Sequence, residues 1–216
     1  MTQPLNFFHS PNTRSLGALA LLKELNADYT LCALNMKVNE QRGAGYMAIN
    51  PMGKVPAIEH AGVLVTEQPA VYMFLAELYP EAGLAPAVGD PLRGAYLRWM
   101  VFYGSCFEPA VIDRAMKHAP SSTAMCTYGD FDTMLATVTA QLAKGPYLLG
   151  DTFSAADILW GTSLGWTTSF GLVPPLPEIT AYVARIEARP SVQWARAHDA
   201  ALVAEHTAAA EAAKQA

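Results

Sequence analysis

The stretch from residue 50 to residue 68, NPMGKVPAIEHAGVLVTEQ, decides the fold of this chain. Apolar residues alternate with polar ones on both sides of Ala61 and Gly62, which predicts a two-stranded hairpin that turns there. Pro56 stands at the start of this hairpin, although a proline cannot donate a hydrogen bond to a sheet. Two interpretations are open: a trans proline at the start of an edge strand, or a cis proline that leaves the N–H and C=O of Val55 pointing outward.

The residues after the hairpin are typical of a binding site for the end of a peptide. Glu67 and Gln68 stand where the second strand ends and a helix begins, with Pro69 in its first turn. The N-terminus of a helix attracts a carboxylate, and a neighbouring acid attracts an ammonium group. Glutathione, whose γ-glutamyl group carries both charges on one carbon, fits this pair and would add to Val55 as an extra strand. Simple capping of the helix is the alternative.

Strand and helix patterns alternate over the first 80 residues in the order β-α-β-α-β-β-α. The predicted elements are a strand at 5–7, a helix at 14–25, a strand at 29–34, an irregular helix at 39–50, the hairpin, and a helix at 68–80. The segment PEAGLAPAVGDP, which follows, contains prolines and glycines and has little periodicity, as linkers between domains do. We therefore expect an α/β domain at 1–80 and a linker at 81–90.

The rest of the chain, 91–216, is predicted to be an all-α domain. Helical periodicity and length mark the segments 92–116, 130–144, 154–171 and 177–202. The alanine-rich tail HTAAAEAAKQA either extends the last helix or frays.

Composition excludes several classes of function. The 216 residues are 52% hydrophobic, and the net charge of −5 comes with no basic stripe that would neutralise phosphates, so nucleic acid is not expected as a partner. No signal peptide or membrane span is evident, which predicts a soluble cytoplasmic protein. Cys32, Cys106 and Cys126 lie far apart in the sequence and predict neither a disulfide framework nor a metal site.

The segments NPMGKVPAI and TEQPAVYMFLAELYP resemble the glutathione-binding half of the cytosolic glutathione S-transferases, and the resemblance extends over the whole chain. It implies a thioredoxin-like N-terminal domain, a cis peptide bond before Pro56, an all-helical C-terminal domain and a homodimer. It also implies glutathione as co-substrate and a small hydrophobic electrophile as the second substrate. The family usually has serine where this chain has Gln68, whose amide can also donate to a carboxylate.

The segment FSAADI, residues 153–158, resembles a capping box and hydrophobic staple of the same family. Ser154 and Asp157 would cap each other's backbone at the start of a core helix, which satisfies two otherwise unpaired donors. This motif is assigned to folding.

Catalysis in the family depends on holding glutathione as its thiolate, which is the nucleophile. The segment FHSPNTRS, residues 8–15, lies between the first strand and the first helix, where the activating group belongs. Ser10 aligns best with the serine-using classes, whose S-x-x-T-R pattern it forms with Thr13 and Arg14. Asn12 is the rival, and Thr13 is a third candidate through its hydroxyl or its N–H. Helix capping alone is the alternative for this segment.

The resemblance also suggests the remaining contacts. Lys54 and Gln41 are expected to meet the glycyl carboxylate of glutathione. The acceptor pocket is expected along the first long helix of the C-terminal domain, where an aromatic stripe is either pocket wall or packed core. The expected acceptor residues are Tyr96, Trp99, Tyr103, Cys106 and Trp166.

Together these observations predict a glutathione transferase that attacks an apolar electrophile. Two alternatives stay open: another glutathione-dependent enzyme (an isomerase, a dehalogenase or a peroxidase), or a binding module of the same fold without catalysis.

Overall fold

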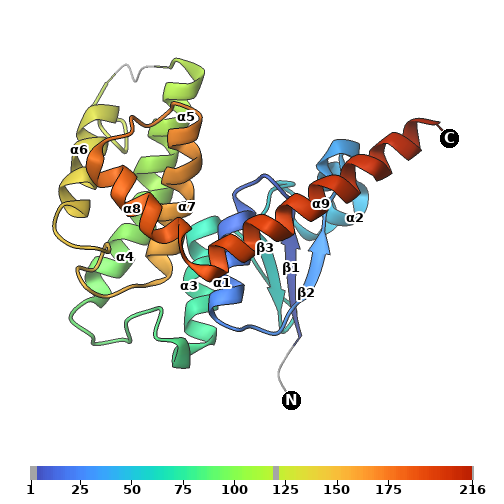
Figure 1. The fold of residues 1–216 in the computed structure, drawn as a ribbon, viewed down its shortest axis with the longest axis horizontal. Coiled ribbons are helices and arrows are strands. Elements are labelled where there is room, and N and C mark those ends of the chain that lie inside the picture. Colours follow the sequence, from blue (N-terminus) through green and yellow to red (C-terminus); the bar gives the residue numbers. More distant parts are fainter. Residues whose placement is uncertain (1–3, 119–121, 216) are drawn as a thin grey trace. The chain divides into compact units, whose positions relative to one another are not determined.

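The computed structural model describes residues 4–118 and 122–215 (Figure 1). Packing divides the chain into two compact units. Unit 1 comprises Met1–Leu75 together with Pro190–Ala216, and unit 2 comprises Ala76–Arg189, the described residues in each case.

Unit 1 contains a four-stranded sheet with the strand order β2-β1-β3-β4. β1 pairs with β2 in parallel and with β3 in antiparallel fashion, and β4 pairs with β3. The elements of this unit are β1 (Leu5–His9), α1 (Ser15–Glu24), β2 (Thr30–Ala33), the 3-10 helices η1 (Met36–Val38) and η2 (Glu40–Arg42), α2 (Ala44–Ile49), β3 (Ala57–His60), β4 (Val63–Val65), the beginning of α3 (Gln68–Leu78), and α9 (Pro190–Gln215). The predicted order β-α-β-α-β-β-α is confirmed.

The hairpin turns where the sequence predicts it. Ala61 and Gly62 connect β3 to β4 with φ angles of 53° and 76°, as a tight hairpin turn requires. The Val55-Pro56 peptide bond is cis, so the second of the two interpretations holds. Pro56 lies immediately before β3 and is buried.

The last helix packs with the first unit. α9 runs beside α1 (Figure 1), and Ala195, for example, is completely buried. The tail segment from His206 onward continues α9 as far as Gln215, so the alanine-rich composition extends the helix. The contacts thus place residues from Pro190 on with unit 1, whereas the predicted domain limits assign them to the C-terminal domain.

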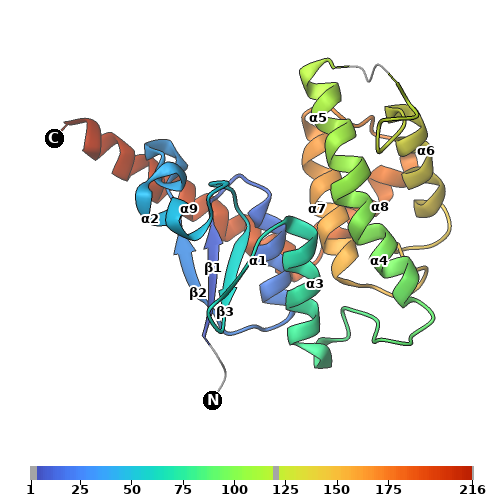
Figure 2. The same ribbon diagram turned by 180° about the vertical axis from the view of Figure 1, so that it is seen from behind.

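Unit 2 is helical. It contains the end of α3, the 3-10 helix η3 (Pro80–Ala82), α4 (Arg93–Phe102), a π-helical turn η4 (Tyr103–Phe107), α5 (Glu108–Met116), α6 (Phe131–Leu142), α7 (Ala155–Ser169) and α8 (Pro177–Glu187). Figure 2 shows α4 and α5 following one another as an almost continuous rod. The predicted helix at 92–116 is therefore present, but one wider turn interrupts its regular hydrogen bonding. The segment 177–202 forms two helices because Pro190 cannot continue the first and instead starts α9.

The FSAADI motif caps α7 as predicted. The Asp157 carboxylate accepts a hydrogen bond from the Ser154 N–H at 2.9 Å. It also accepts from the Leu148 N–H at 2.8 Å and from the Tyr182 hydroxyl at 2.9 Å. Burial raises the pKa of Asp157, while these donors act in the opposite direction. The motif therefore fixes a loop, a helix start and α8 to a single carboxylate.

Gly161 lets α7 and α8 approach each other closely. A Cβ atom at this position would lie 2.5 Å from Ile186 of α8, far inside van der Waals contact. We expect Gly161→Ala to lower the free energy of unfolding by about 1–3 kcal/mol, because overpacking forces the helices apart. Chemical denaturation measures this loss. The control is Gly94→Ala in α4, where a Cβ meets nothing within 4 Å and alanine should raise stability by at most about 1 kcal/mol. Equal effects of the two substitutions would contradict the close approach.

None of the helices in the described part of the chain is both long and apolar enough to cross a membrane.

Candidate functional site

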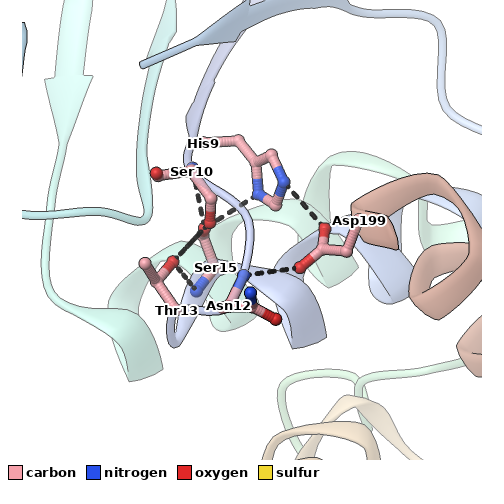
Figure 3. Close-up of polar contacts among 6 residues, drawn as sticks. All are labelled: His9, Ser10, Asn12, Thr13, Ser15 and Asp199. Carbon is pink, nitrogen blue, oxygen red and sulfur yellow. Dashed lines mark hydrogen bonds and ion pairs between the residues drawn. The ribbon is translucent and has the colours of Figure 1, made fainter. Parts of the chain in front are cut away.

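The turn between β1 and α1 holds the three residues predicted to act on a thiol (Figure 3). It starts at His9, the last residue of β1, and ends at Ser15, the first of α1. Ser10 is only 2% exposed, whereas Asn12 is exposed and has a φ of 57°. A left-handed backbone suits asparagine better than most residues, which explains this residue type at the tip of the turn.

The hydroxyl groups of Thr13 and Ser15 are occupied within the turn. The Thr13 hydroxyl donates to the Ser10 carbonyl at 2.7 Å, and Thr13 Oγ1 accepts from the Ser15 N–H at 3.2 Å. Ser15 Oγ accepts from the Ser10 N–H at 3.2 Å and lies 2.8 Å from His9 Nδ1. A hydroxyl has one proton to donate, so Thr13 cannot keep its bond to Ser10 and also donate to a ligand.

The hydroxyl of Ser10 is different. It points away from the cluster that His9, Thr13 and Ser15 form (Figure 3). The N–H and C=O of Ser10 are engaged, but its hydroxyl has no hydrogen-bond partner in the part of the chain that the structure describes. Of the three predicted candidates, Ser10 therefore combines burial with a donor that is still available.

Asp199 of α9 reaches this turn, which the sequence did not indicate. Its Oδ2 accepts a hydrogen bond from the Asn12 N–H at 2.9 Å. Its Oδ1 lies 2.9 Å from His9 Nε2, although the ring N–H is not aligned well enough for a hydrogen bond. His9 is the last residue of β1, and its ring lies between Asp199 and Ser15. No local pattern could reveal this, because nearly the whole chain separates the two residues.

The edge before β3 carries the peptide groups predicted to bind glutathione. β1 and β3 pair Phe8 with Ala57, and the same register continued by two residues puts Ser10 opposite Val55. Val55 is half-buried. Over residues 4–118 and 122–215, no hydrogen bond engages its N–H or C=O, so the free groups expected from a cis Pro56 are present.

The segment before Val55 is held by two side chains of unit 1. The Tyr46 hydroxyl donates to the Lys54 carbonyl at 2.6 Å, and the Asn50 amide donates to the same oxygen at 2.9 Å. Burial raises the pKa of Tyr46, so its phenol keeps the proton that it donates. Gly53 has a φ of 58°, and a Cβ atom on it would lie only 2.7 Å from the carbonyl oxygen of Gln41. Glycine therefore allows these two parts of the backbone to approach closely.

Glu67 and Gln68 lie at the start of α3. The Glu67 carbonyl accepts the Val71 N–H at 2.9 Å, so Glu67 is the first residue to take part in the helix. Its side chain is exposed, and its φ of 62° is rare for a residue with a Cβ. Gln68 is buried and donates from its amide to the Arg14 carbonyl at 3.1 Å. This bond ties the start of α3 to the turn that carries Ser10.

Lys54 and Gln41 are the residues predicted to meet the glycyl carboxylate of glutathione. The Lys54 side chain is exposed, and Gln41 is half-buried in η2. Gln41 Oε1 is buried without a hydrogen-bond partner among the described residues.

The predicted acceptor residues separate into two groups in unit 2. Tyr96, Trp99 and Tyr103 are at most 1% exposed, which corresponds to the packed-core alternative for the aromatic stripe. Trp99 and Tyr103 both pack on Trp160, whose ring N–H donates to the Trp99 carbonyl at 3.0 Å.

Cys106 and Trp166 are half-buried and differ in this from the other predicted acceptor residues. The Cys106 thiol lies 3.6 Å from the Thr127 carbonyl, and the Trp166 ring packs edge-on against Phe170. These two side chains therefore keep some exposed surface.

Comparisons with known proteins identify the family of this chain. Residues 3–77 match the family model described as Glutathione S-transferase, N-terminal domain, and residues 109–185 match that described as Glutathione S-transferase, C-terminal domain. Glutathione S-transferase GstA of Escherichia coli O157:H7 is 27% identical over 88% of this chain and 96% of its own length.

Solved structures give the same result. A glutathione transferase from Methylococcus capsulatus str. Bath is 30% identical, with a TM-score of 0.77 over 91% of this chain and 98% of its own. A sphingomonad glutathione S-transferase in complex with glutathione is also 30% identical, with a TM-score of 0.74 over 90% and 98% of the two chains. With matches to both domains of one family and relatives aligned over nearly their whole length, this chain belongs to the glutathione S-transferase family and is a glutathione transferase.

Proposed function

We propose that this protein binds glutathione along the edge before β3, that the glutathione thiol releases its proton to solvent, and that the Ser10 hydroxyl stabilises the resulting thiolate by donating a hydrogen bond to its sulfur. The thiolate sulfur then attacks a carbon of an apolar electrophile. A carbon–sulfur bond forms, and the leaving group departs with its electron pair. The observation that carries the proposal is that the hydroxyl of buried Ser10, opposite Val55, and the peptide groups of Val55 have no hydrogen-bond partner among the residues that the structure describes.

The backbone of Val55 suits the cysteinyl part of glutathione. An extended peptide that pairs in antiparallel fashion with Val55 would satisfy both its N–H and its C=O. The continued register between β1 and β3 favours a sulfur near Ser10 when the peptide occupies this edge. The sphingomonad relative solved with glutathione supports this choice of peptide.

The start of α3 suits the γ-glutamyl end. The first N–H groups of an 11-residue helix attract a carboxylate, and the exposed Glu67 carboxylate attracts an ammonium group. Gln68 also lies at the start of α3, but its amide already donates one hydrogen bond to the Arg14 carbonyl. Lys54 and Gln41 remain the proposed partners of the glycyl carboxylate.

Ser10 is the preferred activating residue because its donor is available. A hydrogen bond to a charged partner contributes about 1.5–3 kcal/mol, and a lowering of the thiol pKa by one unit corresponds to about 1.4 kcal/mol. One bond from Ser10 together with the positive end of α1 would therefore lower the thiol pKa by about one to two units. Asn12 and Thr13 stay as weaker candidates.

The electrophile is proposed to be small and apolar. The resemblance to the family also supports a homodimer in the cytoplasm. Calorimetric titration with glutathione and turnover of an activated aryl halide test the function directly. Saturable binding with release of one halide for each glutathione consumed is the expected result. Tight binding without conjugation of any electrophile in a broad panel would instead favour a binding module.

Removal of the charge of Glu67 tests the γ-glutamyl site. We expect Glu67→Gln to weaken glutathione binding about tenfold, because an exposed carboxylate that meets an ammonium group contributes about 1 kcal/mol or slightly more. Calorimetric titration measures the change. Glu81→Gln, also an exposed acid but in η3, is the matched control and should bind like the parent protein. If both variants bind glutathione equally well, the γ-glutamyl group lies elsewhere.

A further inference from the structure

Three buried polar side chains form a chain of contacts that ends at the backbone of Ser10. Asp199, His9 and Ser15 are 5%, 0% and 0% exposed. Asp199 Oδ1 lies 2.9 Å from His9 Nε2, and His9 Nδ1 lies 2.8 Å from Ser15 Oγ (Figure 3). Buried polar groups are costly unless they are paired, so an arrangement of three calls for an explanation beyond packing.

The available donors and acceptors allow the following assignment of the protons. The Thr13 hydroxyl already donates to the Ser10 carbonyl at 2.7 Å. A Ser15 hydroxyl that donates to His9 Nδ1 leaves the ring proton on Nε2, where it faces the Asp199 carboxylate. Ser15 Oγ then remains an acceptor for the Ser10 N–H, at 3.2 Å. With this assignment the His9 ring connects the Asp199 carboxylate, by a close contact of 2.9 Å, to the Ser15 hydroxyl that holds the Ser10 N–H.

Asp199, His9 and Ser15 are the residue types of a hydrolase triad, but they cannot act as one here. The Ser15 side chain is completely buried, and its oxygen contacts the N–H and the carbonyl of Ser10. In the hydrolases the serine is bonded to Nε2 and the aspartate to Nδ1, the opposite of the order seen here. Ser15 is therefore bound to a piece of backbone and has no access to a substrate.

We propose that Asp199 and His9 are positioning residues that hold the Ser10 hydroxyl in the orientation that stabilises the thiolate. The proposal rests on the proposed role of Ser10. Asp199 holds the tip of the turn through the Asn12 N–H at 2.9 Å, and through His9 and Ser15 it holds the N–H of Ser10. Both ends of the segment that carries the hydroxyl thus depend on one carboxylate from α9. The last helix of the chain thereby becomes part of the thiol-activating machinery.

The test compares the pKa of the bound glutathione thiol, measured by its thiolate absorbance, in the parent protein and in variants. Asp199→Ala is expected to raise this pKa by at least half of the rise that Ser10→Ala causes. The double variant should show no further rise, because both changes act on the same hydrogen bond. Ser191→Ala is the matched control. Ser191 also lies on α9, but its hydroxyl donates to Glu24 at the end of α1, so its loss should leave the thiol pKa unchanged.

A purely structural role would lower the unfolding temperature of Asp199→Ala without changing the pKa of the thiol, and this result would overturn the proposal while leaving the role of Ser10 intact. A parent protein that binds glutathione without ionising it would overturn the role of Ser10, and the proposal with it.

If the alanine variant does not fold, the pKa of the bound thiol is measured in Asp199→Asn instead. Asparagine keeps the bond to the Asn12 N–H but presents an N–H to His9, which reverses the protons along the chain of contacts. A raised thiol pKa is expected here too, and a pKa equal to that of the parent protein would contradict the proposal.

Discussion

Replacement of Asp157 by alanine is expected to lower the free energy of unfolding by about 3–5 kcal/mol, because it leaves several buried donors without an acceptor. The carboxylate is completely buried and accepts from the N–H groups of Leu148 and Ser154 and from the Tyr182 hydroxyl. Each buried donor without a partner costs about 1–3 kcal/mol, and partial rehydration reduces the sum. Denaturant titration, monitored by tryptophan fluorescence, measures the change.

Asp151 provides the control for this experiment. It lies in the same loop, three residues before Ser154, but its side chain is exposed. Asp151→Ala should therefore change stability by at most about 0.5 kcal/mol. A loss below about 1 kcal/mol for Asp157→Ala would mean that water replaces the carboxylate easily, and the capping motif would then not be a main source of stability for unit 2.

Replacement of Ser10 by alanine is expected to lower kcat/KM for conjugation about 10- to 100-fold near neutral pH. The hydroxyl stabilises the thiolate and not the thiol, so its loss raises the pKa of the bound thiol. The loss of activity should be largest at a pH below that pKa and should shrink as the pH approaches about 9, where glutathione ionises without help. A pH–rate profile separates this effect from a simple loss of binding.

Substitution of Thr13 or Asn12 tests whether a neighbouring residue, and not Ser10, activates the thiol. Thr13→Ala removes a hydroxyl whose proton already goes to the Ser10 carbonyl, so its effect on kcat/KM should be smaller than that of Ser10→Ala. The Asn12 side chain is exposed, and Asn12→Ala leaves the backbone bond to Asp199 in place. An Asn12 variant that loses more activity than the Ser10 variant would transfer the activating role to Asn12.

Local patterns predicted the order of the elements from β1 to α3. The hairpin around Ala61 and Gly62 and the element order both depend on short-range periodicity and turn chemistry, which the sequence displays directly. The cis bond before Pro56 came from the family resemblance, since proline alone left both isomers open. The capping of α7 by Asp157 was predictable because its partner Ser154 lies within the motif, whereas its contacts with Leu148 and Tyr182, which lie outside the motif, were not.

The sequence patterns did not predict the contacts between residues that lie far apart in the chain. The packing of α9 on α1 depends on which apolar faces meet, and periodicity does not specify the partner. The contacts of Asp199 with His9 and Asn12 follow from that packing. An aromatic stripe likewise does not reveal whether it faces a pocket or the core, and in Trp99 and Tyr103 it faces the core around Trp160.

The thiolate absorbance of bound glutathione as a function of pH tests the central claim most directly. For the parent protein the account predicts a thiol pKa of about 7–7.5, about one to two units below the value of about 8.5–9 in solution. For Ser10→Ala it predicts a return most of the way to the solution value, with glutathione still bound through the backbone of Val55. A bound thiol that titrates at the solution value in the parent protein, or at an unchanged low value in Ser10→Ala, would contradict the role assigned to Ser10.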